Sequence, residues 1–171
     1  MPRALRSPQH VRGLPELSAV DRETLRVSNL LADRAGQLLR LARARQIPGG
    51  EENPNISYLW DFADRRKFLE DSNTHAHVVD YCAFGRPFRA RTRLVTFNMT
   101  VPTTDKLRCK GRKICSFTNR PHLQLDGPAH SRGFMTRLKS EYPEQLCRLL
   151  AKSLVSSYTE KRTTRLWNLM R

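Results

Sequence analysis

A long helical repeat of apolar residues near the start of the chain leaves few folds open. From Asp21 to Gln46 the apolar residues recur at helical intervals, Asp21 is available as an N-terminal cap, and four arginines come late, where they favour the helix dipole. Pro48 and the two glycines after it end the pattern. The sequence therefore predicts an amphipathic helix that buries one face against the rest of a globular domain.

The segments that follow alternate between helical and strand-like patterns. A second, shorter helix is predicted over 57–70, and β-branched and aromatic residues predict short strands over 77–82 and 93–97. The chain is then loop-like over 98–141, and Pro143 opens a last helix over 142–158. This order predicts an α/β fold with layered helices and strands.

One domain is expected, because 171 residues suffice for a single hydrophobic core. Proline and glycine make residues 1–17 an irregular N-terminal segment. The folded α/β domain is expected over 18–158, with residues 98–141 as a loop-rich basic Cys/His insertion and 159–171 as a basic tail.

The charge of the chain predicts a polyanionic partner. Lys and Arg number 31 and Asp and Glu 16, a net charge of +15, and residues 81–140 hold thirteen of the cations but two of the acids. Nucleic acid is the expected partner, DNA ahead of RNA; anionic lipid would suit the same charge, but no membrane partner is predicted. With no apolar run long enough to span a bilayer and no apolar leader, we expect an intracellular protein, in the nucleus in preference to other compartments.

Four arginines lie close together in the segment from Phe84 to Arg93. Gly85 and Pro87 shape a turn, and alternate arginines project to one side if the segment is extended. Guanidinium groups fit phosphates and guanine edges, so these side chains are the predicted nucleic-acid contacts. The alternative is a solvated basic loop. The predicted contacts are Arg86, Arg89, Arg91 and Arg93.

Cysteine and histidine spacing offers a candidate metal site. Cys109, Cys115 and His122 lie in one loop-like segment, and Cys82 is a possible fourth ligand from the preceding strand. Three thiolates and an imidazole suit tetrahedral zinc, which could order a loop with little core of its own. The alternatives are buried thiols with a surface histidine, or a site in which His75 or His77 replaces Cys82.

The remaining cysteine, Cys147, falls among the leucines of the last helix, so core packing is expected to account for it. Several catalytic motifs are missing from the chain: a glycine-rich phosphate loop, a Gly-x-Gly-x-x-Gly turn, a serine elbow and a Pro-Cys pair. These absences argue against a self-sufficient catalytic centre.

Glu52-Asn53-Pro54 follows an extended segment, IPGGE, at the point where the chain is expected to leave the sheet. Ligands of open α/β sheets bind at this edge, and a carboxylate and an amide can hydrogen-bond a heterocycle there. The alternative is a plain turn with a solvent-exposed carboxylate.

Taken in order, Glu52-Asn53-Pro54, the segment from Phe84 to Arg93, and Tyr142-Pro143 resemble the C-terminal half of the DNA cytosine-5 methyltransferases. The likeness is nearest to divergent relatives encoded by mobile elements and covers about residues 10 to 155. It implies a partial Rossmann-like methyltransferase sheet with flanking helices. It also implies that Glu52 and Asn53 match the family's Glu-Asn-Val motif, whose Glu holds the target cytosine, and that Gly85 to Arg93 matches its arginine motif.

The resemblance gives this chain no counterpart of the family's S-adenosylmethionine loop or of its Pro-Cys nucleophile, without which the covalent mechanism cannot run. We therefore expect a truncated, catalytically inactive methyltransferase-like domain that binds nucleic acid, with Glu52 and Asn53 as vestigial base contacts and no S-adenosylmethionine bound by this chain alone. A partner chain that supplies the glycine loop and the cysteine could restore S-adenosylmethionine-dependent DNA methylation, and a homodimer could cover the strand edge that the missing half would otherwise cover. The alternative is a small zinc-stabilised module that binds nucleic acid or protein.

Overall fold

The computed structural model describes residues 4–102, 105–125 and 141–169. The elements in chain order are α1 (Ala19–Ala44), β1 (Gly49–Pro54), η1 (Tyr58–Asp61), α2 (Ala63–Leu69), β2 (Thr74–Asp80), η2 (Tyr81–Phe84), β3 (Arg91–Phe97), η3 (Asp105–Leu107) and α4 (Glu144–Leu169), where η marks a short 3₁₀ helix. The fold is therefore mixed α/β, as the sequence predicts.

The described strands form one three-stranded sheet in the order β1-β3-β2. Both β1 and β2 are antiparallel to the central β3, so they run parallel to each other without being neighbours. The register sets Glu52 opposite Leu94 and Asp80 opposite Arg91. One acidic residue of each outer strand therefore lies directly opposite a residue of β3.

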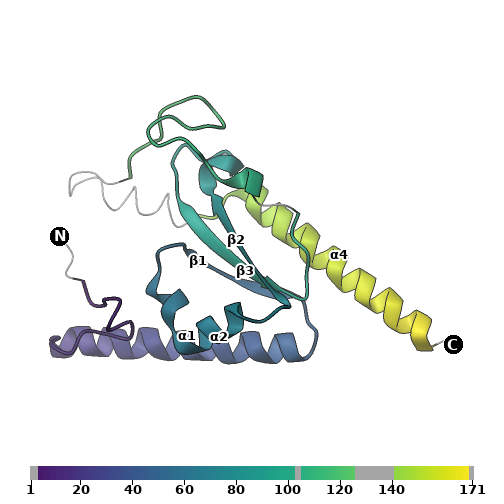
Figure 1. The fold of residues 1–171 in the computed structure, drawn as a ribbon, viewed down its shortest axis with the longest axis horizontal. Helices are drawn as coiled ribbons and strands as arrows, with labels where there is room; N and C mark the ends of the chain where they lie inside the picture. The colour runs from purple at the N-terminus through teal and green to yellow at the C-terminus, as the bar shows by residue number, and fades with distance from the viewer. Residues whose placement is uncertain (1–3, 103–104, 126–140, 170–171) are drawn as a thin grey trace.

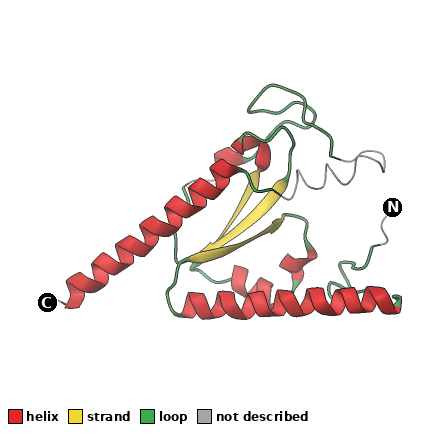
Figure 2. Cartoon of the chain, turned by 180° about the vertical axis from the view of Figure 1, so that it is seen from behind, coloured by secondary structure: helices red, strands yellow, loops and turns green. Residues whose placement is uncertain are grey.

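Helices cover both faces of the sheet (Figure 1). Successive residues of a strand point to opposite faces, so Val95 packs with Phe68 of α2 and with α1, whereas Leu94 packs with the fully buried Leu146 of α4. The C-terminal end of α4 lies clear of the sheet, as Figure 2 also shows. Two small cores, one on each face, hold the layers together.

A buried arginine joins α1, α2 and β1. Arg65 of α2 is 2 % exposed and makes a bidentate ion pair with Glu51 of β1 at 2.6 and 2.9 Å. It also donates to the Ala32 carbonyl of α1 at 3.0 Å. Gly36 leaves the space for this guanidinium, because a Cβ there would come within 2.2 Å of Arg65 Nη1.

The first helix confirms the prediction from the helical repeat, with one change at its start. Ser18 is the N-cap and accepts a hydrogen bond from the backbone N–H of Asp21, which itself lies in the first turn. Leu31 and Leu38 of this helix remain 64 % and 67 % exposed. The helix therefore carries more apolar surface than the described fold buries.

The second predicted helix is wrong as a single element, because it divides at Phe62, whose backbone is extended with ψ 138°. Trp60 and Phe62 are both buried. Trp60 packs in the core with residues of α2 and β3, whereas the Phe62 ring lies under the guanidiniums of Arg6 and Arg12.

Other boundaries also differ from the prediction. Strand β2 ends at Asp80, so Cys82 lies in the 3₁₀ turn η2, which Gly85 ends with φ 85°. Strand β1 continues through Glu52 and Asn53 instead of ending before them. Helix α4 extends to Leu169, beyond the predicted end. The predicted insertion is loop-like where it is described, and its residues 126–140 lie outside the described residues.

Cys147 is exposed, contrary to the expectation of burial. Leu146, the residue before it, takes the core position, and Ser153 and Ser157 follow on the buried side of α4 while Val155 is 63 % exposed. The helix is rotated so that small polar residues, instead of the predicted apolar ones, are buried in this part, where the Ser157 hydroxyl accepts from the Thr100 N–H after β3.

Candidate functional site

Four residues predicted as metal ligands come together in the structure. Cys82 lies in η2 at the end of β2, and Cys109, Cys115 and His122 lie in the basic loop, which we define as residues 106–125. Their candidate ligand atoms all lie within 4.8 Å of one another, and each residue is at most 7 % exposed. We call these four residues the Cys/His cluster; His75 and His77 of β2 are not part of it.

A short hairpin in the basic loop carries two members of the cluster. Ile114 and Pro121 form an isolated antiparallel bridge, the Cys115 N–H donates to the Arg120 carbonyl at 2.8 Å, and the His122 N–H donates to the Lys113 carbonyl at 2.9 Å. Cys115 and His122 therefore sit on facing arms of the hairpin, with their side chains on the cluster.

The turn before this hairpin depends on a glycine. A Cβ on Gly111 would lie 1.7 Å from the Ile114 carbonyl oxygen, so the backbone can pass this closely only without a side chain. The turn lets the loop return between Cys109 and Cys115.

The distance between one sulfur and the imidazole nitrogen fits a tetrahedral ion. Cys109 Sγ and His122 Nε2 lie 3.6 Å apart. An ion bound about 2.3 Å from sulfur and about 2.0–2.1 Å from nitrogen would hold two such atoms about 3.6 Å apart. The other ring nitrogen, Nδ1, lies 3.3 Å from the Arg112 carbonyl, which can only accept, so Nδ1 carries the proton and Nε2 offers its lone pair to the cluster.

Backbone N–H groups stabilise two of the thiols as thiolates. Burial opposes the ionisation of Cys115, but hydrogen bonds from Phe117 and Thr118 outweigh it and lower the pKa to about 6. Burial likewise opposes ionisation of Cys109, and Ser116 donates from its backbone and its hydroxyl, both at 3.4 Å, so that the pKa is lowered.

The third thiol behaves in the opposite way. Burial, together with the neighbouring Cys109 and Cys115, raises the pKa of Cys82. Burial lowers the pKa of His122, but the adjacent cysteines outweigh it and the net shift is upward. Three thiolates this close together repel one another unless a cation lies between them. A bound cation would therefore stabilise the deprotonated cluster, as expected of a metal site.

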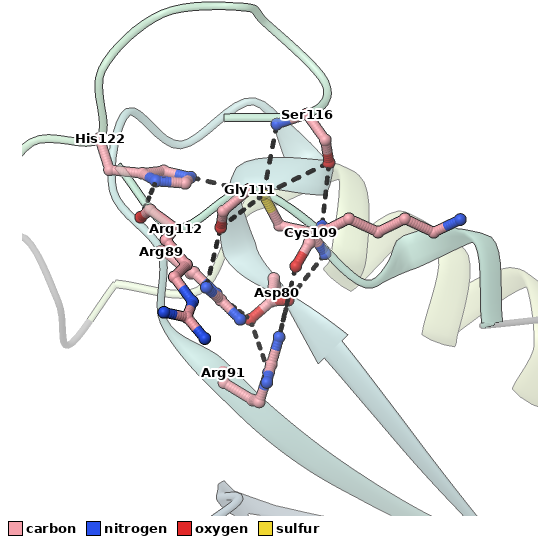
Figure 3. A network of polar contacts seen from close by, with 9 residues as sticks. Asp80, Arg89, Arg91, Cys109, Gly111, Arg112, Ser116 and His122 are labelled. Carbon is pink, nitrogen blue, oxygen red and sulfur yellow. Dashed lines mark hydrogen bonds and ion pairs between the residues drawn. The ribbon is translucent and has the colours of Figure 1, made fainter. Parts of the chain in front are cut away.

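Asp80 joins the sheet to the basic loop (Figure 3). It is fully buried, accepts from both Nε and Nη2 of Arg91 at 3.1 and 2.9 Å, and accepts from the Cys109 N–H at 2.8 Å. Arg89 contacts the same carboxylate at 3.3 Å and donates to the Gly111 carbonyl at 2.9 Å. Burial opposes the ionisation of Asp80, but these donors outweigh it and lower its pKa.

The four predicted nucleic-acid contacts, which we call the sheet arginines, thus have partners within the protein. Arg89 and Arg91 bind Asp80. Arg86 donates to the carbonyls of Glu141 and Tyr142 at 3.2 and 3.1 Å. Arg93 lies over the ring of Trp60, 5.3 Å from its centroid. The sheet arginines are therefore part of the folded scaffold, whatever else they bind.

Glu52 and Asn53, predicted to act together, point to opposite sides of β1, as neighbouring strand residues do. Asn53 lines a hollow beside α1. Glu52 faces the other side, where it accepts hydrogen bonds from Thr92 and, at 2.5 Å, from the Tyr142 hydroxyl. The bond to Glu52 and burial raise the pKa of Tyr142 to about 12.

Glu52 shares a hollow of about 350 Å³ with two of the sheet arginines. Its lining residues are Glu52, Pro54, Ile56, Tyr81, Arg89, Ala90, Arg91, Thr92 and Tyr142. A carboxylate, two phenols and two guanidiniums therefore meet in one concave space at the end of the sheet.

Sequence reasoning missed the surface of the basic loop as the more accessible cationic site. Six of its cations are exposed, and the loop sequence contains no Asp or Glu. We call them the loop cations: Lys106, Arg108, Lys110, Arg112, Lys113 and Arg120. The sequence feature that could have identified this surface is the absence of Asp and Glu between 106 and 125. An arginine-rich segment near a buried acid pairs with that acid, whereas the basic loop has no acid in its own sequence.

No protein-family model matches the chain, and no curated protein and no solved structure matches it either. Among the described helices, none has the length and apolar character needed to cross a lipid bilayer.

Proposed function

We propose that this chain is a nucleic-acid-binding α/β protein whose basic loop is held in shape by one zinc ion. A single observation carries the proposal: four buried ligand atoms lie within 4.8 Å of one another beneath a loop with six exposed cations. The Cys/His cluster supplies the shape and the loop cations supply the affinity.

Zinc is the metal that this donor set favours. Three thiolates and one imidazole are soft and borderline ligands that select zinc over calcium or magnesium, and four protein ligands leave no open position for a reacting water. The ion would then be structural. The basic loop needs such an ion because Leu107 and Leu125 are the apolar residues that it packs onto the core.

Nucleic acid is the partner that the loop cations favour. Phosphate contacts provide most of the affinity of basic proteins for DNA and RNA, and each contact releases bound counterions. A nuclear location and a preference for DNA over RNA remain predictions from the sequence.

Salt dependence of binding tests this proposal. Lys110→Gln with Lys113→Gln should weaken binding of a labelled oligonucleotide and reduce the slope of log affinity against log salt by about 1.4–1.8. The matched control is Lys67→Gln with Lys152→Gln, which removes the same charge from exposed positions on α2 and α4. If both double variants lose affinity equally, the loss reflects the net charge of the chain, and the loop is rejected as the binding surface.

A second candidate function has its own support. Glu52 and two arginines line one hollow, as expected of a methyltransferase-like remnant that holds a flipped base. We propose Glu52 as the base contact in that case.

This second candidate is tested with an unpaired cytosine. Glu52→Ala should abolish any preference for a duplex that carries an extrahelical cytosine over one with an abasic site. Tyr142→Phe is the control, because it removes the hydrogen bond to Glu52 and keeps the carboxylate. A cytosine preference that survives Glu52→Ala would reject the assignment.

A partner that completes the sheet is a further proposal. Among the described strands, β1 pairs with β3 alone, and Leu31, Leu38 and Ile56 nearby are 64 %, 67 % and 90 % exposed. A second copy or another chain could cover this edge and these residues. Sedimentation over a range of concentrations tests for the homodimer.

A further inference from the structure

We infer that the hairpin of the basic loop is a stacking site for single-stranded nucleic acid, with Phe117 as the stacking residue. This inference deepens the proposed function and rests on it. Phe117 lies at the tip of the hairpin, between Cys115 and Asn119, and is 42 % exposed. An aromatic ring held partly in solvent at a hairpin tip is costly to hydrate and offers a face to a ligand.

The hairpin fixes the backbone that carries this ring. The Phe117 N–H donates to Cys115 Sγ at 3.4 Å, and the Asn119 N–H donates to the Cys115 carbonyl at 2.9 Å. Asn119 closes the turn with φ 53°, a left-handed conformation that asparagine tolerates better than most residues. A ring mounted on a preorganised backbone loses little freedom on binding, which favours affinity.

The surroundings of the ring select the class of partner. Lys113 and Arg120, both exposed, lie on the two arms of the hairpin that carries the ring, and Ile114 next to Lys113 is 50 % exposed. Apolar and aromatic groups set among cations complement a chain that alternates bases with phosphates. An acidic protein surface would satisfy the cations but would leave the ring without a matching partner.

The same arrangement favours single strands over a duplex. Bases inside a duplex are stacked on one another and present only their edges, whereas unstacked bases of a single strand can lie against an aromatic face. The loop cations bind phosphates of either form, so Phe117 is the residue that distinguishes the two.

The test measures binding of the full chain, loaded with zinc, to one labelled oligonucleotide as a single strand and as a duplex. Phe117→Ala should weaken single-strand binding between about fivefold and 150-fold and leave duplex binding unchanged. Phe117→Trp should restore single-strand binding, because it restores an aromatic face. Tyr158→Ala, which removes an exposed ring from α4, is the matched control and should change neither.

Metal content of each variant shows whether the hairpin is intact, so a loss of binding with unchanged zinc is a loss of stacking. Unchanged single-strand affinity in Phe117→Ala, or an equal loss for both forms, overturns the inference. If Lys110→Gln with Lys113→Gln still lowers affinity in that case, only the stacking role fails. If the lysine variant binds both forms like the unaltered chain, the proposed function fails as well.

Discussion

The sheet arginines and the loop cations differ sharply in the structure although both form dense basic segments in the sequence. Arg89 and Arg91 are 26 % and 32 % exposed and are bound to a fully buried carboxylate. The loop cations are exposed throughout. A dense run of arginines therefore does not by itself identify a binding surface. Arginines whose guanidiniums pair with an acid of the same fold, as Arg89 and Arg91 do, are part of the scaffold.

Asp80 decides the outcome in this chain. A buried carboxylate must be paired or hydrogen-bonded, and it recruits the nearest donors. Two of those donors are Arg89 and Arg91 and one is the Cys109 N–H, so the residue that binds these two sheet arginines also holds the start of the basic loop. The scaffold and the exposed surface are joined at one side chain.

Removal of the metal should have the largest effect on stability and on binding, because we propose that the metal holds the basic loop in place. The purified chain should contain about one zinc per molecule, and a chelator should lower its melting temperature and abolish nucleic-acid binding. Cys115→Ser should do the same, because it breaks the cluster. Mass spectrometry of bound metal and thermal melting measure both effects.

Cys147→Ser is the control for the cysteine variants, because Cys147 is exposed and lies outside the Cys/His cluster. It should keep full zinc content and an unchanged melting temperature. Equal metal content in Cys115→Ser and Cys147→Ser would contradict the assignment of the cluster as a zinc site and leave the basic loop without its proposed support.

Asp80→Asn should have the next largest effect. It leaves two guanidiniums without their counter-charge, and breaking a buried ion pair on one side costs about 3–5 kcal/mol in the free energy of unfolding. Asp33→Asn is the control, because its pair with Arg12 is largely exposed, 42 % and 48 % for the two side chains, and should cost about 0–1 kcal/mol. Urea denaturation measures both; similar values would mean that Asp80 does not hold Arg89 and Arg91.

Much of the fold could be predicted from local patterns. The first helix is long enough for its periodicity to dominate, and the apolar content of β3 marks it as a strand. The division of the second helix at Phe62 could not be predicted, because it depends on burying two rings in a tertiary setting. Cys147 was misplaced for a similar reason: its neighbour Leu146 took the core position, and sequence alone does not fix the rotation of a helix.

The metal site was more predictable than the basic surface. Cysteine and histidine have few reasons to gather in a loop, so Cys82, Cys109, Cys115 and His122 could be selected by residue type, and the structure brings all four together. Arginine has many possible partners. That Arg91 pairs with Asp80 follows from the β2–β3 register, which the sequence does not state.

The smallest expected effects come from removing one positive charge at a time. Such variants compare the sheet arginines with the loop cations most directly. Arg91→Gln should lower the free energy of unfolding by about 1.5–3 kcal/mol, because Asp80 loses its bidentate donor. Arg112→Gln should change it by less than about 0.5 kcal/mol and should reduce the salt slope of nucleic-acid binding by about 0.7–0.9. Denaturation and salt titration of both variants test the pair. If Arg91→Gln changes the salt slope as much as Arg112→Gln while stability is unaffected, the sheet arginines also bind phosphate, and the division between scaffold and surface fails.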